Sequence, residues 1–432
     1  MTRTIRIQKA TRVEGNAAIH LEVEEGRVKA ARFMVQDFRG FLKLCEGVQV
    51  ESVPHVLSRI CGLCSAAHQV ACLEAVENAL CMAIHPAVSR LRTVCVLGER
   101  IASHALSYFF LTLPGALGAS RGVFDLIRTS PELAGDALSL RKAGLRIVEV
   151  LGKRAVHPVS LGVGRFLIPP TASELEEVRA VAASVRETAA ALIYRVGGKA
   201  PEGDRIPFPV EHRVNFLSYD DRKAAFLPFD RSGAPLAPFS RDTFEERIAE
   251  LRVDWSFAKF PYLAPLGFPD GILLVGPLSR CLSPDGPLAD PEVAGTALAE
   301  RVRDPLRLHL DDLDACRLLE VLDAARRILR LLEGDALPEP AAPLADLEGS
   351  GSGIGVVEAP RGTLVHRILV KRGIVERVRL LVATQFNNAY INLLMRDLAG
   401  SSLENGDIPP SGRERIGRCV RTFDPCLSCA TH

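Results

Sequence analysis

Two Cys-x-x-Cys motifs are the residues of this sequence whose type and spacing could most directly do chemistry. The first is Cys61-Gly-Leu-Cys64 and the second is Cys426-Leu-Ser-Cys429, at opposite ends of a chain of 432 residues. One such motif alone could be a redox pair or half of a zinc site. Two motifs supply four thiolates, for which zinc, an iron–sulfur cluster and a softer transition-metal centre compete.

The wide separation of the two motifs bears on which metal is favoured. Zinc sites that fold a small module usually pair their Cys-x-x-Cys motifs within a few tens of residues. Here 47% of the chain is hydrophobic, so the sequence between the motifs can build a core without the help of a metal. A purely structural zinc is therefore a less natural use of these ligands, and residue chemistry alone leaves it open.

Composition excludes several other classes of protein. Lys+Arg is 53 against Asp+Glu 52, so no net field favours nucleic acid or an anionic membrane as a partner. The N-terminus lacks an apolar signal region and no uncharged apolar stretch reaches 18 residues, so we expect neither secretion nor membrane insertion. We therefore expect a cytoplasmic protein whose cysteines are reduced thiols. We interpret the remaining cysteines mostly as core thiols: Cys45, Cys72, Cys81, Cys95, Cys281, Cys316 and Cys419.

The elements that must position the two motifs are mostly helical, which predicts a mainly α protein with small β elements (α+β) in one large domain, 1–432. Apolar residues at every second position predict strands, and apolar residues three and four positions apart predict helices, in the following order. A β meander (1–40) precedes a helical core (60–200, with helices at 65–113, 131–153 and 172–196), an irregular insertion (200–290), further helices (291–333), a Pro- and Gly-rich surface loop (337–353), and a C-terminal part (356–432) with a hairpin of 363–370 and 374–382.

The residues around both motifs carry a more specific pattern. The first reads Arg59-Ile-Cys-Gly-Leu-Cys-Ser-Ala-Ala-His68 and the second reads Asp424-Pro-Cys-Leu-Ser-Cys-Ala-Thr-His432. This doubled pattern resembles the large subunit of nickel–iron hydrogenases, most closely the cytosolic multisubunit branch of F420-non-reducing or bidirectional type. Further matches lie along essentially the whole chain: Thr11-Arg-Val-Glu14-Gly, Arg39-Gly-Phe, Ser103-His104, His157-Pro-Val and Glu358-Ala-Pro-Arg361-Gly.

The resemblance implies a long-helix bundle that forms one catalytic domain and cleaves H2 reversibly at a nickel–iron centre. Nickel would be bound by Cys61, Cys64, Cys426 and Cys429. Cys64 and Cys429 would also bridge to an iron that carries one carbonyl and two cyanide ligands. Four soft thiolates suit nickel by their own chemistry, which agrees with the resemblance.

The resemblance also implies roles for residues around this centre. Heterolytic cleavage of H2 needs a hydride acceptor and a nearby base together. Arg361 would overhang the open metal position, Arg361 or the thiolate of Cys426 would receive the proton, and Glu14 would relay it.

Four further residues are expected to bind the cofactor, tune it or hold an ion beside it. His68 lies one helical turn after Cys64, so its ring can reach back towards that thiolate and tune the metal. Thr384 matches the hydroxyl that hydrogen-bonds a cyanide in the family, and Pro360 precedes the active-site arginine. His432 matches a ligand of a magnesium or similar ion.

Three departures from the family pattern affect the surroundings of the centre, and one of them is Asn16, which stands where Glu-Gly is commonly followed by His in the family. Leu42 stands where the family has a glutamate that helps to bind the magnesium ion, and an aliphatic side chain cannot ligate. Gly115 stands where the family has an aspartate near the arginine. A hydrogen sensor or a weakly active relative is therefore the alternative to a typical enzyme.

The resemblance implies several partners besides H2. No cysteine outside the four forms a cluster pattern, so the iron–sulfur clusters would lie only in a partner small subunit, with further electron-transfer subunits. A maturation chaperone and a protease that trims an extension after His432 are also implied.

Overall fold

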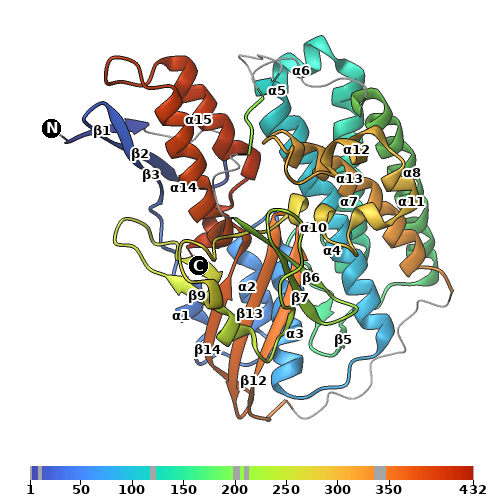
Figure 1. Ribbon diagram of the computed structural model, residues 1–432. Coiled ribbons are helices and arrows are strands. Elements are labelled where there is room, and N and C mark those ends of the chain that lie inside the picture. The colour runs from blue at the N-terminus through green and yellow to red at the C-terminus, as the bar shows by residue number, and fades with distance from the viewer. Residues whose placement is uncertain are drawn as a thin grey trace.

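The computed structural model describes residues 2–7, 12–116, 123–197, 205–208, 214–334 and 347–431. Long helices dominate the described part of the chain, and small sheets lie near both of its ends (Figure 1). The mainly α, α+β architecture expected from the sequence is therefore confirmed. Two residues of the sequence motifs, Thr11 and His432, lie outside the described ranges.

A three-stranded antiparallel meander forms the N-terminal part, where the alternation of apolar residues predicted it. It consists of β1 (Thr2–Ile7), β2 (Ala17–Glu24) and β3 (Arg27–Val35) in that spatial order. Along β2 every second side chain is buried, as expected for a sheet with one face on the core. The sheet lies beside α14 (Ala383–Ser401), so the N-terminal and C-terminal parts of the chain pack against each other (Figure 1).

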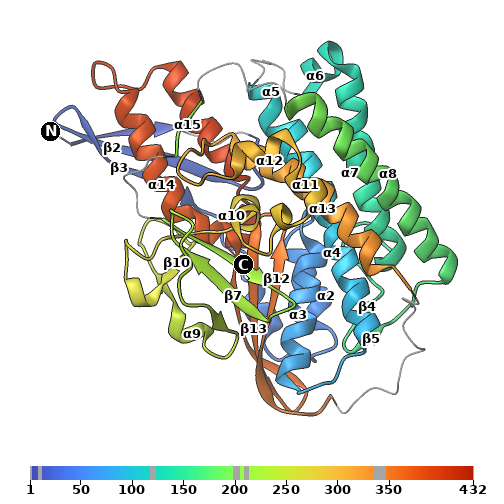
Figure 2. The same ribbon diagram turned by 45° about the vertical axis from the view of Figure 1, so that its right-hand side comes forward.

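Four long helices form the bundle on the other side of the molecule: α4 (Pro86–Leu106), α7 (Pro131–Gly152), α8 (Ala172–Gly197) and α13 (Asp312–Leu331). Proline opens α4 and α7 in the first turn, where its missing N–H costs nothing. The capping box predicted at the start of α8 is present, because Thr171 and Glu174 exchange backbone-to-side-chain hydrogen bonds of 2.8 and 3.2 Å. Figure 2 shows α7, α8 and α13 standing together.

The shorter elements connect the bundle to the sheets. The shorter helices are α1 (Phe41–Cys45), α2 (Val53–Leu57), α5 (Leu113–Ala116), α6 (Val123–Thr129), α9 (Phe244–Arg247), α10 (Pro277–Leu282), α11 (Pro291–Ala294), α12 (Ala297–Val302), α15 (Pro410–Phe423) and α16 (Leu427–Ala430). Three short 3-10 helices among the described residues are η1 (Ser58–Ile60), η3 (Ala264–Leu266) and η4 (Pro287–Ala289), and η2 (Ser107–Thr112) is a π-helix. Between α7 and α8 the short strands β4 (Leu161–Gly162) and β5 (Arg165–Phe166) pair with each other. The strands of the irregular segment are β6 (Asn215–Asp220), β7 (Ala225–Phe229), β8 (Phe239–Ser240), β9 (Ile248–Leu251), β10 (Phe260–Leu263) and β11 (Leu273–Leu274).

The C-terminal sheet contains one strand more than the sequence predicted. The expected hairpin is β13 (Gly362–Lys371) with β14 (Ile374–Leu381), and β12 (Gly351–Ala359) pairs with β13 on its other side. The prediction of a surface loop over 337–353 was therefore wrong at its C-terminal end. Of that loop, residues 337–346 lie outside the described ranges.

The glycines of β12 let helix α3 (Ser65–Ala79) lie directly on the sheet. A Cβ atom at Gly353 would stand 2.2 Å from the carbonyl oxygen of Ala75, and one at Gly355 would stand 2.0 Å from that of Ala71. No side chain fits in that space. The alternating glycines therefore set the distance between helix and sheet, and so the position of the residues at the start of α3.

We predict that Gly353→Ala destabilises the protein by about 1–3 kcal/mol, because the added methyl group forces α3 away from β12. Denaturant unfolding followed by circular dichroism measures the change. Gly135→Ala is the matched control, because Gly135 lies exposed in α7 with nothing within 4 Å of its added Cβ, and it should be neutral or slightly stabilising. Equal unfolding free energies for the Gly353 variant and the wild type would contradict the proposed close contact.

Candidate metal centre

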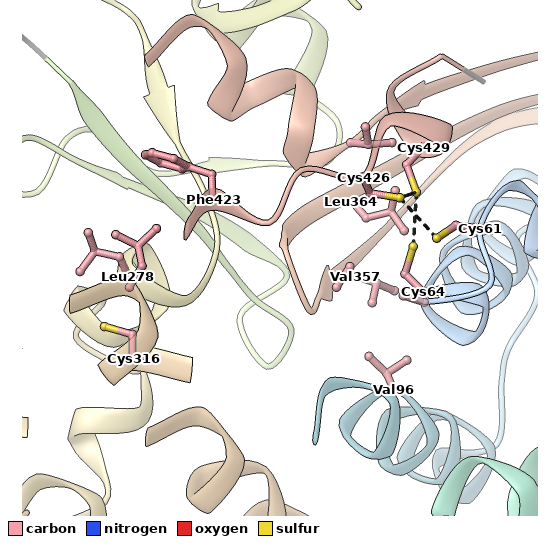
Figure 3. Close-up of a cluster of buried hydrophobic side chains, with 14 of the residues drawn as sticks. Cys61, Cys64, Val96, Leu278, Cys316, Val357, Leu364, Phe423, Cys426 and Cys429 are labelled. Carbon is pink, nitrogen blue, oxygen red and sulfur yellow. Dashed lines mark hydrogen bonds between the residues drawn. The ribbon is translucent and has the colours of Figure 1, made fainter. Parts of the chain in front are cut away.

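The four cysteines of the two motifs converge on one buried point. Their Sγ atoms all lie within 4.8 Å of one another, and none of the four residues is more than 5% exposed (Figure 3). The shortest separations are 2.8 Å between Cys426 and Cys429, 3.3 Å between Cys61 and Cys426, and 3.4 Å between Cys64 and Cys429. Residues 365 positions apart in sequence thus form one cluster.

Local structure presents each cysteine pair to the cluster. Cys61 follows the turn η1, and Cys64 is the residue directly before α3, so the positive end of the helix dipole lies next to its sulfur. Cys426 directly precedes α16 and Cys429 lies within it. The backbone N–H of Cys426 donates a 2.8 Å hydrogen bond to the hydroxyl of Thr384, which anchors this segment to the start of α14.

The crowding of four thiols shifts their ionisation. Burial raises the pKa of Cys426 and of Cys429 well above the ordinary value. Hydrogen bonds from the neighbouring thiols, Cys426 first, hold the pKa of Cys61 well below it. Four thiolates cannot share such a space without a cation, so this set of donors fits a soft metal ion.

Arg361 lies close enough to this cluster to interact with its thiolates, and Asp424, two residues before Cys426, holds it in place. Its Nε donates to the backbone oxygen of Asp424 at 2.7 Å, and its Nη2 pairs with the Asp424 carboxylate at 3.0 Å. Despite burial, Asp424 and the nearby thiolates hold the pKa of Arg361 well above its ordinary range. Its Nη1 is buried with no hydrogen-bond partner among the described residues. An unsatisfied donor beside four thiols fits a centre that carries an acceptor ligand.

A buried ionic network holds the turn that delivers Arg361. Arg280 pairs with Glu320 and, at 2.7 Å, with Glu358, and donates to the carbonyl oxygens of Ala359 and Pro360 at 3.0 and 2.9 Å. Burial opposes the ionisation of Glu320, but the charge and hydrogen bonds of Arg280 outweigh it and hold the pKa of that carboxyl well below its usual range. Pro360 thus contributes a backbone anchor to the turn.

Glu14 lies against the second cysteine motif. A short parallel bridge joins it to Cys426, and the Cys426 thiol donates to Glu14 Oε2 at 3.2 Å. The backbone N–H of Ser428 donates to the same oxygen at 3.0 Å, while the Ser428 hydroxyl donates to Oε1. Sequence reasoning missed Ser428; its place between the two cysteines of the motif was the available signal.

The expected target of His68 needs correction. Sequence spacing pointed to the sulfur of Cys64, but His68 Nε2 lies 3.4 Å from the sulfur of Cys429. The ring projects from the first turn of α3 towards β13, where its Nδ1 lies 3.0 Å from Nε2 of His366. Helical spacing fixes which face of α3 carries the ring, but only the packing of α3 on the sheet decides which sulfur it meets.

Glu99 is a second residue that sequence reasoning missed. It lies buried in α4, and its carboxyl oxygens accept hydrogen bonds from the backbone N–H groups of Ala66 and Ala67 at 2.7 and 3.0 Å. These are orphan donors at the start of α3, so Glu99 fixes the helix end that carries Cys64. Burial raises the pKa of Glu99 to about 8.

The remaining sequence predictions are placed as follows. Arg39 donates its backbone N–H to the carbonyl oxygen of Thr431 at 3.0 Å, so the Arg-Gly-Phe segment lies beside the end of the second motif. Leu42 is half-buried in α1 nearby, and Gly115 lies in α5. His432 lies outside the described residues. The other cysteines are buried core thiols except Cys81, which is exposed, so that interpretation was wrong for this residue.

A buried set of four thiols near a fixed guanidinium fits a cysteine-ligated metalloprotein, and comparison with known proteins gives the family. The family model described as nickel-dependent hydrogenase matches residues 39–114 and 333–432, and one described as HoxL-like matches residues 4–38. The beta subunit of the NAD-reducing hydrogenase HoxS of Cupriavidus necator is 30% identical over 100% of this chain and 95% of that protein. The chain belongs to the nickel-dependent hydrogenase large subunits, which are oxidoreductases.

Other relatives agree with this family assignment. An F420-non-reducing hydrogenase subunit of Methanothermobacter marburgensis is 29% identical over 99% of this chain and 94% of that protein. A crystal structure of an NAD+-reducing [NiFe]-hydrogenase in the H2-reduced state superposes with a TM-score of 0.85 at 28% identity, covering 100% of this chain and 99% of that one. Within the described ranges, no helix is both long and apolar enough to cross a membrane.

We predict that the metal-free wild type loses stability relative to Glu99→Gln as the pH rises from about 5 to 8. The folded state keeps the Glu99 proton up to a pKa of about 8, whereas the unfolded chain releases it near the ordinary value. The folded state therefore binds more protons in this window, and its relative stability falls by at most about 1.4 kcal/mol per pH unit. Urea unfolding at several pH values measures the difference. Parallel curves for the two proteins would show that Glu99 is ionised in the fold.

Proposed function

We propose that this chain is the catalytic large subunit of a nickel–iron hydrogenase that cleaves H2 reversibly and heterolytically and passes the electrons to an iron–sulfur small subunit. The observation that carries the proposal is the convergence of four buried Sγ atoms within 4.8 Å, with Arg361 close enough to interact with them electrostatically. Membership of the nickel-dependent hydrogenase family supports the same conclusion.

The four cysteines would hold the cofactor. Cys61, Cys64, Cys426 and Cys429 bind nickel in this proposal, and Cys64 and Cys429 also hold an iron with one carbonyl and two cyanide ligands. When bound, the centre supplies a redox-active Lewis acid that polarises H2 and accepts its electrons. Thr384 and the unpartnered Nη1 of Arg361 are donors suited to cyanide nitrogens. A magnesium ion near His432 would find no ligand in the side chain of Leu42.

Cys426 is favoured over Arg361 as the group that receives the proton. A guanidinium whose pKa is held above its already high value stays protonated and has no acceptor site. The sulfur of Cys426 lies 3.2 Å from Glu14 Oε2, so a proton on this sulfur can pass directly to the carboxylate. Glu14 and Ser428 are half-buried, which gives the relay a side open to water.

The assembly follows from the same proposal. The relatives are named as subunits of larger hydrogenases. We propose an iron–sulfur small subunit with further electron-transfer subunits, a maturation chaperone and protease, and a cytoplasmic location. Gly115 supplies no carboxylate, and among the described residues Asp424 is the one carboxylate paired with Arg361. This favours, as the alternative, a hydrogen sensor or a weakly active enzyme.

We predict that Cys426→Ser and Cys61→Ser each abolish hydrogen uptake and lower the nickel content at least tenfold, because a hydroxyl is too hard and stays protonated. Cys81→Ser, at an exposed site, is the matched control and should behave as the wild type. Metal analysis with infrared spectroscopy of purified holoprotein tests the centre itself. Zinc alone, without carbonyl and cyanide bands, would contradict the proposed function.

We predict that Glu14→Gln lowers H/D exchange at least tenfold while the infrared bands stay unchanged, because the amide keeps the shape but cannot carry the proton. Ser428→Ala should lower exchange less, since it removes the hydroxyl and leaves the backbone N–H that holds Oε2. Exchange at the wild-type rate in Glu14→Gln would remove this carboxylate from the proton path.

A further inference from the structure

Two buried histidine rings and one cysteine sulfur form a continuous hydrogen-bonded row. His366 Nε2 lies 3.0 Å from His68 Nδ1, and His68 Nε2 lies 3.4 Å from Cys429 Sγ. The ring centroids are 5.2 Å apart and neither residue is more than 1% exposed. The row thus runs from the middle of the sheet to the cluster, out of reach of bulk water.

The fold builds this row from two elements. His68 lies in the first turn of α3, and His366 lies in β13 opposite Gly355 of β12. The absence of a side chain at Gly355 lets α3 lie against the sheet, which brings the two rings into contact. A residue that only filled space at position 366 could be apolar. His366 instead places a ring nitrogen 3.0 Å from Nδ1 of His68.

The direction of each hydrogen bond follows from the chemistry of the acceptor. A metal-bound thiolate has no proton, so the bond between His68 and Cys429 requires a proton on His68 Nε2. A neutral imidazole carries one N–H, and its Nδ1 is then an acceptor. The nitrogen that faces Nδ1 is Nε2 of His366, which must therefore carry the proton and donate.

We propose that His366 is a positioning residue that fixes the tautomer of His68 and thereby keeps a hydrogen bond on the sulfur of Cys429. The inference rests on the proposed function, because it needs a metal-bound thiolate as acceptor. Without the His366 donor, the alternative tautomer of His68 becomes accessible and turns a lone pair towards the sulfur. Loss of a group that hydrogen-bonds a metal ligand, as His68 does here, commonly lowers metal affinity by about 10–100-fold.

A pair of variants separates the positioning role from packing. His366→Leu keeps a buried apolar bulk and removes the donor, while His366→Gln keeps an N–H that can reach His68 Nδ1. We expect nickel affinity, measured by competition with a chelator, to fall about 10–100-fold in His366→Leu and only a few-fold in His366→Gln. Circular dichroism identifies any variant that fails to fold. If His366→Leu fails to fold, the inference is tested with His366→Gln.

Two spectroscopic readouts report the tautomer and its effect. The first readout is NMR of holoprotein labelled with 15N-histidine in an EPR-silent state, with His68→Gln used to assign the signals. We expect the signal of a protonated Nε2 of His68 in the wild type and in His366→Gln. In His366→Leu we expect this signal to be lost. The carbonyl band should move to lower wavenumber in His366→Leu, because the sulfur gains electron density.

A His366→Leu variant with wild-type nickel affinity and an unchanged His68 signal would overturn the inference, and so would equal losses in the Leu and Gln variants. Failure of the proposed function looks different, because the wild type itself would then hold zinc or lack carbonyl and cyanide bands.

Discussion

The mutual approach of four buried thiols is the constraint on which the rest of the structure depends. Four thiolates within 4.8 Å repel one another and are shielded from water, so they cannot all ionise without a cation between them. Because the two pairs lie 365 residues apart, a metal that binds all four also joins the two ends of the chain. Metal binding and the closure of the fold are therefore coupled.

The surrounding elements hold each side of this cluster against that repulsion. On the N-terminal side, the glycines of β12 bring α3 close to the sheet and Glu99 caps the backbone at its start. On the C-terminal side, Thr384 and Glu14 bind the segment around Cys426. Arg280 fixes the turn of Arg361 independently of both. The site is thus assembled from separately anchored pieces whose geometry does not depend on one flexible loop.

The parts of the structure governed by local rules were predictable from the sequence. Proline at Pro86 and Pro131 and the Thr171 capping box marked helix starts, and the repeated motif identified the four cysteines. The strand β12 was not predictable, because its Gly-Ser composition is typical of a loop and only the approach of α3 requires it. The same limit explains the cysteine that His68 meets and the missed partners His366 and Ser428, since each depends on packing between distant segments.

The altered surroundings of the centre have a direct electrostatic consequence. Where relatives are expected to surround the active-site arginine with two carboxylates, Arg361 has only Asp424 as an ionic partner among the described residues, because Gly115 offers none. Its charge is then less compensated, and it stabilises negative charge on the nearby sulfurs more strongly. A thiolate stabilised in this way is a weaker base, so Cys426 would release its proton to Glu14 more readily and take one up less readily. In the proposed mechanism this change acts on both directions, because Cys426 would take up a proton from H2 during oxidation and from Glu14 during H2 production.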